Sequence, residues 1–133
     1  MLIDVNSSSN VPVEAEFEII KTSDDKVDVI AQLKNSKGDN ISVPVCLNCY
    51  FSADPDGLSF SDSMRAVDAY STPDRRAFMI TNTMGSGQVH GACIFDADGH
   101  LHLNLVDVYP ATSYFVVVFP SGQLAVSDLI EFL

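Results

Sequence analysis

The chain has 133 residues, 47% of them hydrophobic, and its 18 acidic and 7 basic residues give a net charge of −11. That length suits one domain that buries a core without disulfides, and the apolar content excludes a disordered chain. The charge disfavours nucleic acid and anionic lipid as partners and favours a basic protein partner. A solvated acidic surface explains the same charge without any partner.

The sequence shows neither a membrane span nor a secretion signal. No run of about 18 apolar residues is present, and residues 1–10 lack a basic segment followed by an apolar one. Three cysteines, an odd number, fit reducing conditions better than a disulfide framework. We therefore expect the protein to fold in a cytoplasm.

Regular alternation of side chains begins at residue 13. Residues 13–20 alternate apolar and acidic side chains, and residues 27–33 alternate apolar and polar ones. A period of two predicts half-buried strands. Turn-forming residues at 35–40 and 53–57 flank a third expected strand at 45–51. Residues 1–12 are expected to form a flexible N-terminal arm, and residues 13–133 a single domain.

The middle of the chain, residues 58–87, has a poor pattern. Short strands are possible at 65–70 and 77–81, and a single helical turn at 63–66. Gly85, Ser86 and Gly87 then precede the next regular segment.

The last third predicts four strands, at residues 88–95, 101–107, 113–119 and 123–132. Turn-forming residues separate them at 98–99, 109–112 and 120–122. Asp98-Gly99 suits a two-residue hairpin turn, so we expect these strands to form a β-meander.

Two of these strands have unusual patterns. Residues 114–119, YFVVVF, do not alternate, which predicts a central strand covered on both faces, or on one face and by a partner. In the last strand the polar Asp128 interrupts an apolar face, so we expect a β-bulge near Ser127-Asp128. The apolar residues of that face share one parity: Leu124, Val126, Ile130 and Phe132.

The pattern as a whole predicts an all-β fold. Seven or more short strands without a long amphipathic helix favour an antiparallel sandwich or a small barrel. We expect nine residues of alternating segments to be mostly buried: Val13, Phe17, Val29, Leu33, Leu103, Val116, Val118, Leu124 and Val126.

Candidate metal ligands are explained more simply as structural residues. Cys46 and Cys49 have zinc-ligand spacing, but within a strand they point to opposite faces, and no second pair exists. We expect all three cysteines, with Cys93, to be small core thiols. His100 and His102 share a strand face and could bind a metal or sense pH, although two solvent-facing polar positions are the favoured interpretation.

Two Asp- and Gly-containing stretches, residues 54–57 and 96–99, invite a calcium interpretation. An EF-hand counted from Asp96 would place Leu101 at its sixth position and Asp107 at its twelfth, where Gly and Glu are required. Turn formation explains both stretches, and a looser calcium site built from several loops stays open. No nucleophile-elbow, Walker or H-E-x-x-H motif is present, so we expect no enzymatic activity and no cofactor.

Residues 26–59 and 91–133 resemble a β-sandwich family among structural proteins of tailed bacteriophages. The family patterns are V-x-V-x-x-Q-L-x-D-x-x-G, Y-x-S-D-x-x-G, S-D-A-D-G and Y-L-V-V-V-L-P-N-G-x-L-V-V-S-G-A-I-T-F. The corresponding segments here are Gln32 to Asn35 with Gly38, Tyr50 to Gly57, Asp96 to Gly99, and Tyr114 to Phe132. Asp128 replaces the usual Gly, and residues 64–87 have no counterpart.

The resemblance implies an immunoglobulin-like antiparallel β-sandwich that is a component of a virion assembled in the host cytoplasm. Its most specific form is a head decoration (cement) protein that binds the major capsid protein and other copies of itself, without nucleic acid or membrane. Alternatives are a tail, connector or fibre-base component, and a carbohydrate- or receptor-binding module.

Two groups of residues are candidates for a partner interface. The first, Leu2, Ile3 and Val5, alternates like a strand and would add to a neighbour's sheet edge, although a frayed terminus is equally expected. The second combines residue types enriched at interfaces, although closing one end of the sandwich is an alternative role. Its members are Phe60, Met64, Arg65, Arg75, Arg76 and Met84.

Overall fold

The computed structural model describes residues 10–61, 68–71, 90–106 and 110–133. These ranges contain strands and no helix, and therefore no helix that could cross a membrane. The eight strands are β1 (Glu14–Ser23), β2 (Lys26–Lys34), β3 (Val45–Ser52), β4 (Asp68–Ser71), β5 (His90–Phe95), β6 (His100–Val106), β7 (Ala111–Val118) and β8 (Leu124–Phe132). The all-β prediction is confirmed, and each expected strand that lies in these ranges is present within a few residues of its expected bounds.

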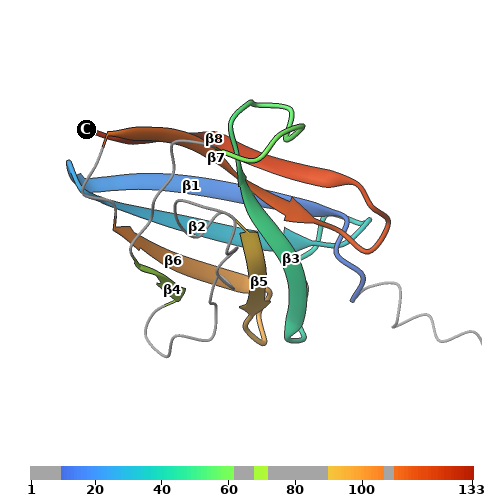
Figure 1. The fold of residues 1–133 in the computed structure, drawn as a ribbon. Coiled ribbons are helices and arrows are strands. Elements are labelled where there is room, and N and C mark those ends of the chain that lie inside the picture. The colour runs from blue at the N-terminus through green and yellow to red at the C-terminus, as the bar shows by residue number, and fades with distance from the viewer. Residues whose placement is uncertain (1–9, 62–67, 72–89, 107–109) are drawn as a thin grey trace, which may run out of the picture.

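The strands form two antiparallel four-stranded sheets, in the orders β1-β2-β6-β4 and β5-β3-β7-β8 (Figure 1). The sheets face each other and enclose one core, so the predicted antiparallel sandwich is confirmed. Its immunoglobulin-like character stays a prediction. The expected strand at 65–70 overlaps β4, whereas the segments at 63–66 and 77–81 lie outside the described residues.

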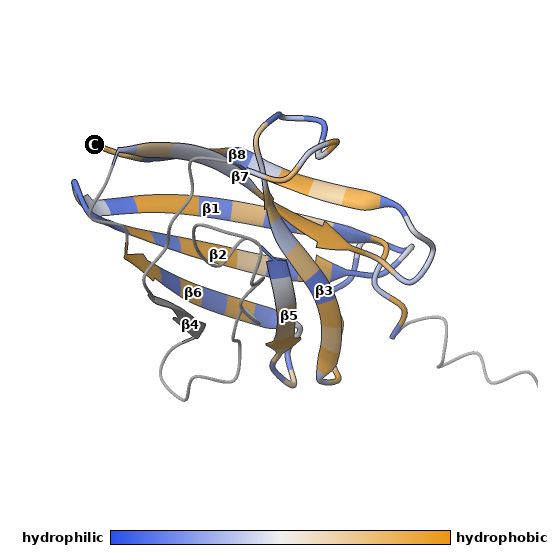
Figure 2. Cartoon of the chain, viewed as in Figure 1, coloured by the Kyte–Doolittle hydropathy of each residue, from blue (hydrophilic) through white to orange (hydrophobic). Residues whose placement is uncertain are grey.

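Alternation along β2 and β6 produces the core, as the two-coloured pattern of these strands shows (Figure 2). Every second residue of each strand is buried against the opposite sheet. Val29, Leu33 and Leu103 are fully buried, as expected. Val13 and Phe17 are only half-buried, because β1 is the edge strand of its sheet and has a neighbouring strand on one side.

Strand β7 is covered on both faces, which explains its apolar run. Phe115 and Val117 belong to the core between the sheets. Val116 points to the outer face and is nevertheless fully buried, while Val118 is half-buried. The cover over Val116 comes from the chain itself, since the loop that follows β3 packs there through Gly57.

The predicted meander is wrong. Strand β5 pairs with β3 and β6 pairs with β2 and β4, so the turn at Asp98-Gly99 carries the chain from one sheet to the other. A turn is present there, with Gly99 at a φ of 68°, but it is not the expected two-residue turn. The Gly99 N–H donates to the Asp96 carbonyl and the Asp96 N–H to the His100 carbonyl, both at 2.9 Å, so three residues, 97–99, form the turn. Turn residues specify a reversal of direction and do not select the partner strand. Of the three turns expected in the meander, the one at residues 120–122 joins two paired strands, β7 and β8.

The predicted bulge in β8 is confirmed. Tyr114 lies opposite Leu129 and Val116 opposite Val126, so Ser127 and Asp128 together face the single residue Phe115. The Phe115 N–H donates to Ser127 Oγ at 2.9 Å, and that hydroxyl donates to the Asp128 carbonyl at 2.8 Å.

The same bulge overturns the expectation for Leu124. An extra residue reverses which positions face the core, so Ala125 packs inward before the bulge and Ile130 and Phe132 do so after it. Leu124 is consequently 39% exposed and Val126 is half-buried, and the four apolar residues do not share one face.

A glycine substitution tests the sheet-crossing turn. A Cβ at Gly99 would lie 2.9 Å from both Cβ and the carbonyl oxygen of Ile41, and the positive φ adds strain. We expect Gly99→Ala to lower the free energy of unfolding by about 2–4 kcal/mol. Gly38 has a similar φ of 82° and nothing within 4 Å of such a Cβ, so Gly38→Ala should cost only about 1 kcal/mol. Urea titrations of both variants measure the difference, and equal losses would contradict it.

Candidate interaction surface

The loop between β3 and residue 61 is held together by Asp54. Its Oδ1 accepts hydrogen bonds from the N–H groups of Asp56 and Leu58, at 2.9 and 3.1 Å, and its Oδ2 accepts one from the Ser59 hydroxyl at 2.8 Å. These hydrogen bonds lower the pKa of the Asp54 carboxyl, and the bond from the Leu58 N–H has the largest effect. The side chain is therefore ionised at neutral pH and fixes the loop.

The loop is also fastened to the outer face of the β3–β7 sheet. Tyr50 Oη donates to the Gly57 carbonyl, and the N–H of Ser61 donates to the Phe51 carbonyl at 2.8 Å. Gly57 has a φ of 74°, and a Cβ there would lie 3.2 Å from Leu124 Cδ1. Only glycine lets the loop lie this close to the sheet.

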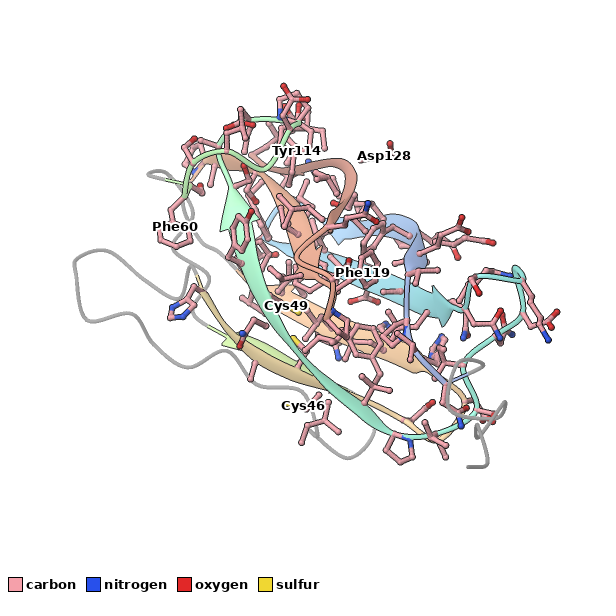
Figure 3. All side chains as sticks on the ribbon, turned by 90° about the vertical axis from the view of Figure 1, so that its right-hand side faces the viewer. Cys46, Cys49, Phe60, Tyr114, Phe119 and Asp128 are labelled. Atoms are coloured by element: carbon pink, nitrogen blue, oxygen red, sulfur yellow. The ribbon has the colours of Figure 1, made fainter. Side chains whose placement is uncertain are left out.

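A groove of about 590 Å³ opens beside this loop, and we call it the loop groove. Phe60 sets its ring edge-on to Tyr50, with centroids 5.3 Å apart, and lies 6.1 Å from the ring of His90. Figure 3 shows Phe60 on the loop, well apart from Asp128 of the end strand β8. The lining residues are Asn48, Cys49, Tyr50, Gly57, Leu58, Ser59, Phe60, His90 and Val118.

Two apolar side chains of the loop groove remain open to solvent. Leu58 is 80% exposed and Phe60 is 53% exposed, although the backbone that carries them is hydrogen-bonded. The lining residues that the structure describes include no Asp, Glu, Lys or Arg, in a chain with a net charge of −11. An uncharged aromatic patch on an acidic protein has the composition of the centre of a protein interface.

Two titratable groups of the loop groove have raised pKa values. Burial, the largest cause, and the neighbouring Cys93 raise the pKa of the Cys49 thiol well above its usual value, so it stays protonated and weakly nucleophilic. Burial also raises the pKa of the Tyr50 hydroxyl, with a smaller contribution from Asp54. The Cys49 and Tyr50 side chains can therefore make apolar contacts and hydrogen bonds as neutral groups.

Among the predicted interface residues, Phe60 lies in this groove. Leu2, Ile3, Val5, Met64, Arg65, Arg75, Arg76 and Met84 lie outside the described residues, so their interface roles stay predictions. Sequence reasoning missed Leu58, Tyr50 and His90 as members of the same surface. The available sequence signal for Leu58 was an apolar residue directly after the Asp-Pro-Asp-Gly turn, where polar residues are usual. No such signal exists for His90, which the fold alone brings close to Phe60.

Two of the three expected core thiols, Cys49 and Cys93, are buried, but the expectation is wrong for Cys46, because its position in β3 points away from the core. Cys46 is exposed and Cys49 is buried, on opposite faces of β3, and none of the three cysteines forms a disulfide. In Figure 3, Cys46 lies at the far end of the strand from the loop groove. Residues described in the structure include no group of three or more His, Cys, Asp or Glu side chains arranged for a metal.

The histidines and the Asp-Gly turns also have structural roles. His100 and His102 lie half-buried on the outer face of β6, with His102 Nε2 3.2 Å from Asp28 Oδ2. Asp96 Oδ1 accepts the N–H groups of Asp98 and His100, at 2.8 and 3.0 Å. Both expected Asp-Gly turns therefore use a carboxylate to bind backbone, as turn chemistry predicts.

Comparison of the chain with family models, with curated proteins and with solved structures found no match. The resemblance to phage structural proteins therefore rests on the quoted sequence patterns, and the role it implies stays a prediction.

Thiol reactivity tests the burial of the cysteines. In the folded protein, a thiol reagent should modify Cys46 rapidly and Cys49 and Cys93 slowly, because two of the three side chains are buried. Under denaturing conditions all three should react. A single reactive group after denaturation would reveal a disulfide and contradict the structure.

The Asp54 bonds predict a pH-dependent loop. A carboxyl whose pKa is lowered by folding stabilises the folded loop above the unfolded value of about 3.9, and this stabilisation is lost as pH falls through the folded pKa. We expect Asp54→Asn to speed hydrogen exchange at the Asp56 and Leu58 amides at neutral pH and to flatten its dependence on acid. Asp56→Asn, in the same loop, serves as the control and should leave both amides protected.

Proposed function

We propose that the chain is a structural protein of a bacteriophage particle whose sandwich binds another virion protein through the loop groove. The most specific form of the proposal is a head decoration protein that binds the major capsid protein. The observation that carries the binding role is the exposed pair Leu58 and Phe60 on a loop fixed by hydrogen bonds. The virion setting comes from the sequence resemblance.

Rigidity of the loop favours binding. Ordering a flexible loop on association would cost roughly 0.5–1.5 kcal/mol for each immobilised side chain. The bonds of Asp54 and of Tyr50 already fix this backbone in the free protein. Burial of Leu58 and Phe60 in a complex would therefore stabilise it with a smaller loss of conformational entropy.

Charge fits a position on the outside of a particle. Glu14, Glu16 and Glu18 are exposed along one face of β1, and the net charge of the chain is −11. An acidic surface turned away from packaged DNA avoids repulsion, and the uncharged loop groove is free to face the shell. Many identical sites on a shell give high occupancy from modest single-site affinity when the protein is abundant.

A receptor- or carbohydrate-binding role is the second candidate, because the groove clusters three aromatic rings. Tyr50, Phe60 and His90 contact one another in series, and Asn48 and Ser59 supply polar groups beside them. Rings with adjacent hydrogen-bonding groups also suit a sugar. The arrangement favours a protein partner more, since the aliphatic Leu58 is 80% exposed beside the rings.

Binding to particles tests the proposal. Purified protein added to expanded shells that lack it should bind stoichiometrically and raise their disruption temperature. Leu58→Glu should weaken binding at least tenfold, because a charge enters a surface that is desolvated in the complex; tenfold corresponds to about 1.4 kcal/mol. Leu133→Glu, at another exposed apolar residue outside the groove, is the matched control and should bind like the unchanged protein.

Three outcomes would contradict the proposal in whole or in part. Binding to isolated tails alone would favour a tail component, binding to a glycan array with loss on Phe60→Ala would favour the carbohydrate role, and equal binding by Leu58→Glu would remove the loop groove from the interface. Circular dichroism of each variant confirms that the fold is intact.

A further inference from the structure

A second groove, of about 520 Å³, lies where the two sheets meet along β1 and β8, and we call it the edge groove. Its lining from β1 includes both the inward-facing Phe17 and Ile19 and the outward-facing Glu18. Side chains of both parities line a groove only where it runs along the edge of a strand. The remaining lining residues are Lys21, Val27, Asp128, Leu129 and Glu131.

Both strands beside the edge groove end their sheets. β1 is the last strand of one sheet and β8 the last of the other, and the two pack side by side (Figure 1). A terminal strand presents backbone N–H and C=O groups along its open side, which an added extended segment can pair with. The floor of the edge groove is apolar, with Leu129 45% exposed.

The rim of the edge groove is acidic. Glu18 stands on the β1 side and Asp128 and Glu131 on the β8 side, and Lys21 is the one base among the described lining residues. Apolar positions alternate with these acids along β1, in the order Phe17, Glu18, Ile19. A strand lying in the groove would meet apolar and acidic side chains on its two faces.

We propose that the edge groove binds an extended polypeptide segment of a partner protein whose side chains alternate between apolar and basic. Its backbone pairs with an open strand edge, its apolar side chains cover Phe17, Ile19 and Leu129, and its basic side chains face the three acids. This surface is separate from the loop groove, and the proposal stands whether or not the chain is a virion protein.

Charge selects this occupant over a copy of the chain itself. Residues 1–9 contain one acid, Asp4, and no Lys or Arg. An N-terminal arm from a second copy therefore has no basic side chain to pair with the acids of the rim. Two whole copies also repel each other through a net charge of −11 on each. A basic segment is instead attracted by the negative electrostatic potential of the chain.

Peptide titration tests the proposal. The probe is a nine-residue peptide of alternating lysine and valine, blocked at both ends, and binding is followed by calorimetry at 0.15 M salt, where the Debye length is about 8 Å. We expect saturable binding, weakened at least tenfold when glutamate replaces the lysines and also when proline replaces the central residue. Proline removes a backbone donor, so its effect reports strand pairing.

Charge-reversal variants locate the site. Asp128→Lys with Glu131→Lys should weaken binding of the lysine peptide at least tenfold and create binding of the glutamate peptide. The control, Asp39→Lys with Asp56→Lys, changes two exposed acids outside the groove by the same total charge and should keep the original preference.

Other results would overturn the proposal. Equal weakening in both double variants would show attraction by net charge alone. Peptide binding that occurs only after deletion of residues 1–10 would show that the chain covers its own edge groove. Melting temperatures of all variants exclude loss of fold as the cause.

Discussion

The contact of Phe115 with Phe17 and Phe51 joins the two sheets, and both surfaces depend on it. The Phe115 ring lies 6.2 Å from that of Phe17 across the core and 5.6 Å from that of Phe51 on the adjacent strand. Burying such a side chain contributes roughly 1.5–3 kcal/mol. With Phe115 turned inward, Val116 must turn outward, and its burial requires a cover. The loop carrying Gly57 supplies that cover and thereby presents Leu58 and Phe60.

The inward orientation of Phe115 also affects β8, the strand that pairs with β7. The bulge at Ser127 and Asp128 satisfies the Phe115 N–H through a side-chain hydroxyl, where a regular ladder would use a carbonyl. It also turns Asp128 and Leu129 both toward solvent, at the edge where β8 passes β1. The loop groove and the edge groove thus arise on different sides of the central strand β7.

Local patterns predicted the elements of this fold well, and pairings between distant segments poorly. Alternation in β1, β2 and β6 and the apolar run of β7 predicted strands, burial and a covered central position, and Asp128 predicted the bulge. The meander was wrong because Asp98-Gly99 specifies a reversal and says nothing of the sheet that receives the next strand. The prediction for Leu124 was wrong because of the bulge. Across a bulge the alternation shifts by one residue, so positions of the same parity face the core on one side of it and solvent on the other.

The candidate surface was predicted least well, for a physical reason. Phe60 was identified by residue type, but the groove needs Tyr50, Leu58 and His90 beside it, from a strand, a loop and a strand more than 30 residues further along the chain. No periodicity in the sequence reports that proximity. The carboxylate of Asp54 looked like a calcium ligand and in fact binds the backbone of its own loop.

The bulge also limits how this protein can aggregate. Two identical β8 edges brought together antiparallel would need a continuous ladder, and the extra residue at Ser127 and Asp128 breaks it in each copy. The bulge therefore opposes pairing of β8 with a second copy of β8, while residues 129 to 131 keep a regular register with β7. A break of this kind discriminates against the same strand of another copy without closing the edge to a shorter segment.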